Sequence, residues 1–182
     1  PKQKNLARLQ RLATELMDLL SKPTEAGVTF LTDPRLRPDG EKGLLVNTLT
    51  AFEEYYRQRA QLWEIQAISR ARFIAGHPGV GRQFDELAAR LANFEQPSQP
   101  LAAYTPRWKP DICQMRLRIE KERTPAGKEA LAIKTGAGGL IDVEFIAQIM
   151  ALAHGWHEPN TLRALERARE NQALSRSQAG RL

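Results

Sequence analysis

The stretch Lys134-Thr-Gly-Ala-Gly-Gly-Leu-Ile-Asp-Val-Glu-Phe-Ile-Ala-Gln148 places three glycines directly before an apolar run that carries two carboxylates. A glycine-rich turn that opens a helix presents backbone N–H groups and the positive end of the helix dipole at one point, which suits a phosphate or a carboxylate. Lys134 stands just before the turn, so Lys134, Gly138 and Gly139 are candidate nucleotide- or phosphate-binding residues. The same spacing fits a structural helix start, and the sequence favours that interpretation.

The apolar run after the glycines predicts a helix from Leu140 to His154. Asp142 and Glu144 are two positions apart, and on a helix such residues point about 200° away from each other. This spacing argues against a catalytic carboxylate pair. Asp142, in the first turn, fits an interaction with the helix N-terminus, whereas Glu144 shares a face with Gln148. Both acids remain candidate supporting residues of a site.

Helical periodicity dominates the rest of the chain, so the predicted fold class is mainly α, a helical bundle. Two short β-branched or aromatic runs, 28–32 and 43–46, are predicted strands, although two such strands alone make only a marginal sheet. Residues 130–133 are expected to be extended, and 175–182 to begin a further helix. The expected helices span 5–20, 50–71 (opened by a capping box at Thr50 and Glu53), 80–94, 111–123, 140–154 and 161–171.

Charge and composition limit the classes of partner. The net charge of +6 is confined to 1–22 and 160–182, each with a net +3, and the centre of the chain is neutral. Two basic helix faces of this kind do not make a phosphate-tracking stripe, so no nucleic-acid partner is expected. No apolar run nears the roughly 20 residues that cross a membrane, and the lone Cys113 indicates a reducing compartment. We therefore expect a cytoplasmic protein without membrane association.

A second candidate site is the segment Asp33-Pro-Arg-Leu-Arg-Pro38. Arg35 and Arg37 are two positions apart, so they lie on one side of an extended chain that begins with the carboxylate of Asp33. A metal-binding acid beside two phosphate-binding arginines has this pattern. A turn with surface ion pairs has it as well, and the local sequence does not decide between the two.

Polar residues also interrupt the predicted helix 50–71. Gln66 and Arg70 are four positions apart on one face, and Glu64 precedes them. We expect such groups to join the helices of a bundle rather than to bind a ligand. Glu64 and Arg70 are kept as candidate supporting residues.

Four segments, taken in order and with their spacing, resemble the glutamine synthetase adenylyltransferases. They are Asp33-Pro-Arg-Leu-Arg-Pro-Asp-Gly with Gly43-Leu-Leu-Val; Trp63-Glu-Ile-Gln-Ala with Arg70-Ala-Arg; Met115-Arg with Arg118; and Lys134-Thr-Gly-Ala-Gly-Gly-Leu-Ile-Asp-Val-Glu-Phe with Gln148. The resemblance implies that residues 1–49 are the C-terminal part of a polymerase-β-like nucleotidyltransferase α/β domain. It implies a helical bundle in residues 50–182, cut short at its C-terminus.

The same resemblance implies an enzyme that moves AMP from ATP to a tyrosine of glutamine synthetase, with Mg²⁺, under the control of the PII signalling protein. A paired half of such enzymes removes the AMP, and the sequence leaves open which half this is. Asp33 matches the last of three metal-binding carboxylates of the family. Because the chain contains no Asp-x-Asp pair, it is expected to be inactive by itself. A non-catalytic helical interaction or regulatory module is the alternative.

Overall fold

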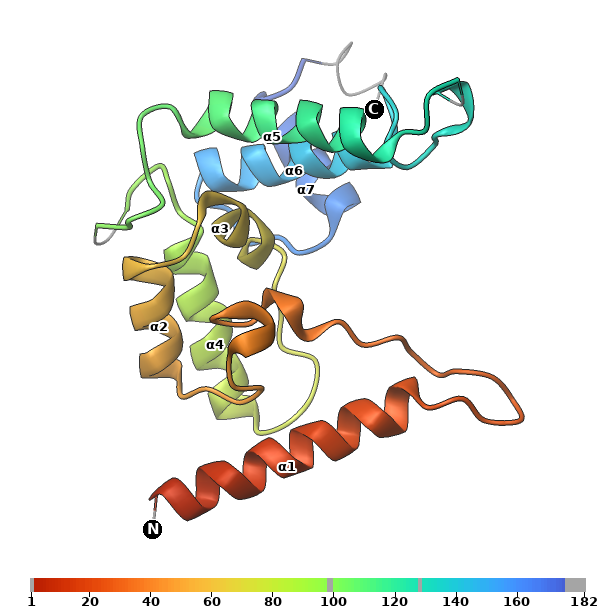
Figure 1. The fold of residues 1–182 in the computed structure, drawn as a ribbon. Coiled ribbons are helices and arrows are strands. Elements are labelled where there is room, and N and C mark those ends of the chain that lie inside the picture. Colours follow the sequence, from red (N-terminus) through yellow and green to blue (C-terminus); the bar gives the residue numbers. More distant parts are fainter. Residues whose placement is uncertain (1, 98–99, 128, 176–182) are drawn as a thin grey trace. The chain divides into compact units, whose positions relative to one another are not determined.

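The structure, a computed structural model, describes residues 2–97, 100–127 and 129–175. Within these ranges the chain forms α-helices and short 3₁₀ helices but no strand (Figure 1), so the predicted mainly helical class is confirmed. None of the helices in these ranges is long and apolar enough to span a membrane. The elements are α1 (Lys2–Ser21), η1 (Pro34–Leu36), η2 (Gly40–Lys42), α2 (Leu49–Gln58), α3 (Leu62–Ile68), α4 (Pro78–Leu91), α5 (Trp108–Arg123), η3 (Glu129–Leu131), α6 (Leu140–Ala153) and α7 (Thr161–Glu170).

The two predicted strands, 28–32 and 43–46, do not form. A strand needs a neighbour with which to share main-chain hydrogen bonds, and the described part of the chain offers these segments none. The first segment is held by the end of α1 instead: the Phe30 N–H donates to the Leu20 carbonyl at 3.0 Å, and Ser21 Oγ accepts the Thr32 N–H at 3.2 Å. The strand predictions are wrong because β-branched composition favours a strand only where a partner strand is present.

The predicted helix 50–71 is two helices, α2 and α3, separated by residues 59–61. A carboxylate of Glu64 accepts the N–H of Gln61 at 2.8 Å, as in a capping box. This contact starts a new helix at α3, and it explains the break. Glu64, a candidate supporting residue of a site, therefore has a structural task.

The remaining predicted helix boundaries differ less from the observed ones. The cap of α2 is Thr48, whose Oγ1 accepts the N–H of Ala51 at 3.2 Å, so the predicted capping box at Thr50 is wrong. Residues 130–133 are predicted to be extended, but residues 130 and 131 belong to the 3₁₀ helix η3. A turn of 3₁₀ helix forms hydrogen bonds between neighbouring backbone groups, so no partner strand is needed. The helix predicted for 175–182 lies outside the described residues from 176 onward. Helices α1, α4, α5, α6 and α7 form where the periodicity predicts them.

The chain divides into two compact units, Pro1–Tyr55 and Tyr56–Leu182. In the first unit the Gln10 side chain of α1 donates to the carbonyl of Val46 at 2.6 Å and accepts its N–H at 3.1 Å. Among residues 5–50 only Pro38 is buried. Four leucines along one side of α1 remain 48–72% exposed: Leu9, Leu12, Leu16 and Leu19. The first unit therefore has an apolar helix face without a core to cover it.

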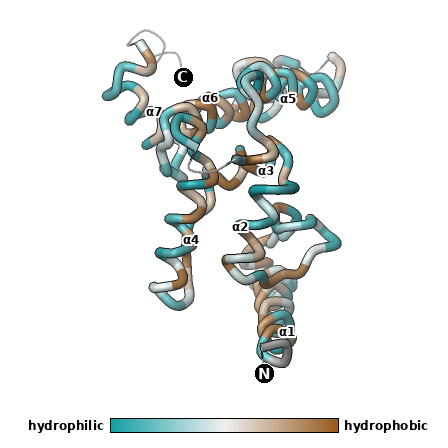
Figure 2. The backbone as a smooth tube through the Cα atoms, turned by 90° about the vertical axis from the view of Figure 1, so that its left-hand side faces the viewer, coloured by the Kyte–Doolittle hydropathy of each residue, from teal (hydrophilic) through white to brown (hydrophobic). Residues whose placement is uncertain are grey.

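The second unit has a core of its own. α6 contacts α5 and α7, and α3 contacts α4, α5 and α6; α5 and α6 lie side by side (Figure 1). Ile65 of α3, Ile112 of α5 and Leu152 of α6 are fully buried. Of the neighbouring helices α5 and α6, α6 carries more of the hydrophobic residues (Figure 2). Helix α6 is thus the central element, and it begins at the glycine-rich loop.

Gly155, which follows α6, is expected to resist substitution. Its φ is 62°, in the left-handed region, and a Cβ there would lie 2.7 Å from the side chain of Asn93. Asn93 Oδ1 accepts the N–H groups of Glu95 and Gln96, both at 3.0 Å, so it cannot move away without losing them. We expect Gly155→Ala to lower the free energy of unfolding by about 2–4 kcal/mol, the sum of backbone strain and overpacking.

The matched control is Gly127→Ala, where φ is 77° and a Cβ meets no atom within 4 Å. It should cost only the backbone strain, about 1–2 kcal/mol. Urea unfolding followed by circular dichroism measures both variants, and equal losses would contradict the steric argument.

Candidate functional site

The glycine loop, Lys134–Gly139, uses its backbone N–H groups internally. The N–H groups of the loop and of the following turn that find carbonyls of the chain are Gly136 to Ala132 (2.7 Å), Gly139 to Gly136 (3.0 Å), Leu140 to Ile133 (2.9 Å), Ile141 to Lys134 (3.1 Å) and Asp142 to Gly139 (3.0 Å). A Cβ on Gly136 or Gly139 would lie less than 3.0 Å from carbonyl oxygens, which explains these two glycines. These N–H groups are therefore used within the loop and the first turn of α6, as the structural interpretation of a helix start predicts.

Asp142 takes the place at the loop where an anion would be expected. Its Oδ2 accepts the Gly138 N–H at 2.6 Å and an Arg116 Nη2–H at 2.9 Å, and its Oδ1 lies 2.6 Å from Arg116 Nε. Arg116 Nη2 also donates to the Gly136 carbonyl at 2.9 Å, and Nη1 lies 3.3 Å from Glu120. The contacts at Nη2 are hydrogen bonds, whereas those at Nε and Nη1 are ion pairs without hydrogen-bond alignment. We call this set, centred on Arg116 and Asp142, the arginine clamp.

The arginine clamp joins α5 to the start of α6 and fixes the glycine loop between them. The Arg116 side chain is 7% exposed and that of Asp142 29%. Charge-assisted hydrogen bonds in such a setting are about twice as strong as neutral ones. The N–H of Gly138 is taken by Asp142, so a phosphate there would have to displace a carboxylate of the protein. The phosphate-binding roles of Lys134, Gly138 and Gly139 stay predictions.

Arg116 is the site residue that the sequence analysis did not single out as functional. The feature that could have revealed it is its spacing. Arg116 follows Trp108 and Ile112 at intervals of four residues, so it lies on the same buried face of α5. A cation on the buried face of a helix requires a carboxylate partner. No local pattern indicates that the partner is Asp142, which is 26 residues away in the sequence.

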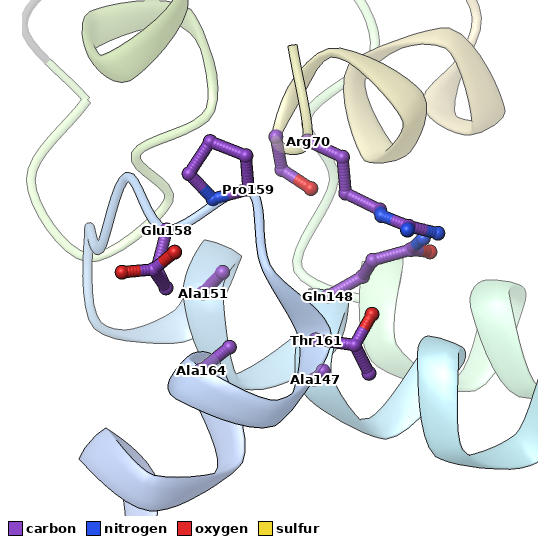
Figure 3. A pocket seen from close by; sticks show the side chains of 9 residues that line it. Arg70, Ala147, Gln148, Ala151, Glu158, Pro159, Thr161 and Ala164 are labelled. Carbon is purple, nitrogen blue, oxygen red and sulfur yellow. The ribbon is translucent and has the colours of Figure 1, made fainter. Parts of the chain in front are cut away.

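Two polar pairs join α3 to α6. Gln66 Nε2 donates to Gln148 Oε1 at 2.6 Å in a buried setting, and one turn along, Arg70 Nη1 lies 3.3 Å from Glu144 Oε1. Gln66 and Arg70, four residues apart on and just after α3, thus contact Gln148 and Glu144, which are four residues apart on α6. Arg70 and Gln148 lie close together in Figure 3. The prediction that Gln66 and Arg70 join helices is confirmed, and Glu144 takes part in the same contact.

A single substitution in the buried pair should be costly, because it leaves a polar group without its partner. We expect Gln66→Leu to lower the free energy of unfolding by about 1–3 kcal/mol through the desolvated amide of Gln148. The double variant Gln66→Leu/Gln148→Leu should lose less than Gln66→Leu alone, since both polar groups are then gone. Denaturant titrations of the unaltered protein, the single variants Gln66→Leu and Gln148→Leu and the double variant test this order. A double loss equal to the sum of the single losses would disprove the coupling.

A small hollow borders this contact (Figure 3). Its lining includes Arg70, Gln148, Glu158, Pro159 and Thr161, and its volume is about 10 Å³. That is room for about one water molecule. Pockets that take drug-sized ligands are roughly 300–1,000 Å³, so this hollow does not hold a nucleotide.

Asp33 is bound by its neighbour Arg35. Arg35 Nη2 lies 2.6 Å from Oδ2, Nε donates to Oδ1 at 2.8 Å, and the Arg35 N–H donates to Oδ1 at 3.1 Å, which also caps η1. These hydrogen bonds, the side-chain ones first, lower the pKa of Asp33 from 3.8 to about 2, and the same pair raises the pKa of Arg35. Any stability from this exposed pair is present above pH 3.8 and is lost as the pH falls through about 2.

Arg37 serves the same loop in a different way. Its Nε donates to the carbonyl of Gly43 at 3.0 Å, Nη1 to Pro34 at 2.7 Å and Nη2 to Glu41 at 2.9 Å. All three guanidinium nitrogens thus close the segment 34–43 on itself. Of the two arginines predicted to bind phosphate, Arg35 holds a carboxylate and Arg37 holds carbonyls, and their phosphate roles stay predictions.

A magnesium site needs several oxygen ligands around one ion. Among the residues that the structure describes, no group of three or more His, Cys, Asp or Glu lies close enough to hold a metal ion. Asp33 is a single carboxylate, and both its oxygens face Arg35. The described residues by themselves therefore do not fit Mg²⁺.

Comparison with known proteins gives consistent matches. The sequence profile of glutamate-ammonia ligase adenylyltransferases matches residues 3–87, and that of PII-uridylyltransferases matches residues 112–182. The chain is 38% identical to the bifunctional glutamine synthetase adenylyltransferase/adenylyl-removing enzyme of Neisseria meningitidis serogroup A over 84% of its length. It is 40% identical to the enzyme of the same name from Streptomyces avermitilis over 81%, and 38% identical to that of Aromatoleum aromaticum over 82%.

The chain spans only 14–16% of the length of these relatives. Within that span the four segments around Asp33, Trp63, Arg116 and Lys134 lie inside a similarity that covers most of the chain. Identity of 38–40% over more than four-fifths of the chain shows the family. The chain belongs to the glutamine synthetase adenylyltransferase family.

Proposed function

We propose that this chain is part of an enzyme that transfers AMP from ATP to a tyrosine of glutamine synthetase or removes it again. In the transfer, the tyrosine hydroxyl gains AMP and loses its proton, and pyrophosphate leaves. In the removal, phosphate attacks the AMP to form ADP, and the tyrosine oxygen leaves and regains its proton. The single observation that carries this proposal is the 38–40% identity with enzymes of that name over at least 81% of the chain. The proposal includes Mg²⁺ as cofactor, PII as a regulatory partner and the cytoplasm as location.

We propose that residues 1–49 complete an α/β nucleotidyltransferase domain and that residues 50–182 form the helical bundle after it. The exposed leucine face of α1 supports this assignment, as do Phe30 and Leu31, which are 67% and 86% exposed. An aliphatic helix face needs another element to cover it, and the strand-forming composition of residues 28–32 favours a sheet as that element. Under this proposal that sheet belongs to the longer protein.

Residues 1–182 alone should not transfer AMP. Asp33 is one carboxylate held by Arg35, Arg37 is bonded to carbonyls, and the glycine loop is held by Asp142. These observations favour a supporting role for the helical bundle, and they keep a non-catalytic interaction module as the second candidate. The two candidates differ in what the longer protein does, because only the first predicts chemistry.

The test uses the longer protein with glutamine synthetase, ATP and Mg²⁺, followed by mass spectrometry of intact glutamine synthetase. The proposal predicts a mass increase of one AMP per modified subunit, or its loss when modified subunits are supplied with phosphate. A protein that binds glutamine synthetase and changes its mass in neither direction would support the interaction module instead.

Residues 112–182 carry a further clue to the division of tasks. They match the profile of a second family, whose description names a different nucleotide, uridylyl, and a different acceptor, PII. We therefore infer that most of α5, the glycine loop, α6 and α7 perform a task common to both kinds of enzyme. Selection of the base and of the acceptor protein then falls to other residues.

A further inference from the structure

The segment 34–43 is a closed turn with an unusual backbone. Asp39 and Gly40 both lie in the left-handed region, with φ of 61° and 54°. Gly43 passes so close to Pro38 that a Cβ on Gly43 would collide with the Pro38 carbonyl. A backbone of this kind persists only where surrounding contacts determine it, and such places are concentrated at functional sites. We call residues 34–43 the 34–43 turn.

The contacts that determine this turn come from one side chain and not from a hydrophobic core. Among residues 5–50 only Pro38 is buried. The backbone N–H groups of Arg37, Gly40 and Gly43 each donate to a carbonyl just three residues earlier. The Arg37 side chain reaches further, because Nη1 donates to the Pro34 carbonyl at 2.7 Å and Nε donates to the Gly43 carbonyl at 3.0 Å. One guanidinium thus joins the two ends of the turn.

The third nitrogen of the same group, Nη2, donates to the Glu41 carbonyl at 2.9 Å. A guanidinium suits this task, since its N–H donors diverge in a fixed plane and reach several acceptors at once. Hydrogen bonds from a charged donor are also about twice as strong as neutral ones. A lysine ammonium is a compact point charge and does not reproduce this arrangement. A phosphate that bound Arg37 would have to compete with three carbonyls of the protein.

We propose that Arg37 is a positioning residue of the transfer reaction: it holds the 34–43 turn closed, and through the turn it fixes the place of Asp33. This inference rests on the proposed function and on the predicted role of Asp33 in it. Asp33 directly precedes Pro34, whose carbonyl Arg37 holds, and its Oδ1 caps the same 3₁₀ turn by accepting the Arg35 N–H at 3.1 Å. Opening the turn therefore displaces Asp33 without removing it.

The first measurement is hydrogen exchange of the peptide that covers residues 33–43 in the longer protein. Arg37→Met should speed the exchange of the Gly40 and Gly43 N–H groups about tenfold or more, with an unchanged thermal transition. Arg37→Lys should exchange as fast as Arg37→Met. The matched control is Lys42→Met, which removes an exposed cation from the same turn and should leave exchange unchanged.

The second measurement is AMP transfer by the same proteins. A misplacement of about 1 Å can cost about a hundredfold in rate. Arg37→Met and Arg37→Lys should therefore lower kcat about tenfold to a hundredfold, with KM for ATP within about twofold. Gly43→Ala keeps the guanidinium but forces Gly43 and Pro38 apart, so it should reproduce both the faster exchange and the lower kcat. Lys42→Met should transfer within about twofold of the unaltered protein.

A direct contact between Arg37 and the nucleotide gives a different pattern. Slow transfer by Arg37→Met with unchanged exchange would overturn the proposal, as would restored transfer by Arg37→Lys or a rise in KM for ATP at unchanged kcat. Normal transfer by Arg37→Met or Gly43→Ala in spite of faster exchange would overturn it as well. If the unaltered longer protein transfers no AMP, the proposed function fails, while the exchange measurement still decides whether Arg37 holds the turn closed.

Discussion

Arg116→Met should lower the free energy of unfolding of the second unit by about 3–5 kcal/mol, because it leaves the Asp142 carboxylate partly buried without its cation. The lost contacts are the pair with Asp142 at 2.6 Å and 2.9 Å, the hydrogen bond to the Gly136 carbonyl at 2.9 Å and the ion pair with Glu120 at 3.3 Å. Small domains are stable by only about 5–15 kcal/mol, so this variant should be partly unfolded at body temperature. Tryptophan fluorescence during urea unfolding reports this unit, since Trp63, Trp108 and Trp156 all lie in it.

The matched control is Arg118→Met, on the same helix but exposed, which should change stability by less than about 0.5 kcal/mol. Arg116→Lys should recover little, since an ammonium group cannot reproduce the forked contacts of a guanidinium. The double variant Arg116→Met/Asp142→Leu should be more stable than Arg116→Met, because removing both charges removes the unpaired one. If Arg116→Met loses no more than Arg118→Met, the arginine clamp has no role in holding the loop.

The helices were predictable because each buries its own periodic face. The apolar spacing of 140–154 predicts α6 to within a residue, and Asn160 caps α7 as expected, with Oδ1 accepting the Arg163 N–H at 3.1 Å. The strands failed for the opposite reason. A strand depends on a partner that is distant in the sequence, and the described residues do not contain one for 28–32 or 43–46.

The candidate site was predictable only in part, because its contacts join distant residues. Position on a helix correctly grouped Glu144 with Gln148 and Gln66 with Arg70, but it could not reveal that the two pairs meet each other. Likewise, three glycines before a helix predict free N–H groups, unless a carboxylate in the first turn folds back to accept one. Asp142 does so at Gly138 because Arg116 holds it there.

Asp33→Asn in the longer protein should reduce AMP transfer by about a thousandfold or more, which corresponds to about 4 kcal/mol in the activation free energy. Asparagine caps a helical turn as well as aspartate does, so the 3₁₀ turn η1, capped by Asp33 Oδ1 at 3.1 Å, should persist. The substitution therefore removes the charge and keeps the local fold. It separates the predicted role of Asp33 as a charged ligand from its observed role as a cap. The ion pair with Arg35 is lost together with the charge.

The matched control is Asp39→Asn, six residues further on, at a backbone position with φ of 61° that asparagine adopts readily. It should leave transfer within about twofold of the unaltered protein. Transfer by the Asp33→Asn protein is measured as incorporation of AMP into glutamine synthetase, with circular dichroism to establish that its helices are intact. If Asp33→Asn transfers AMP as well as Asp39→Asn does, the carboxylate of Asp33 is structural. The carboxylate ligands of the transfer reaction must then all lie outside the segment 33–38.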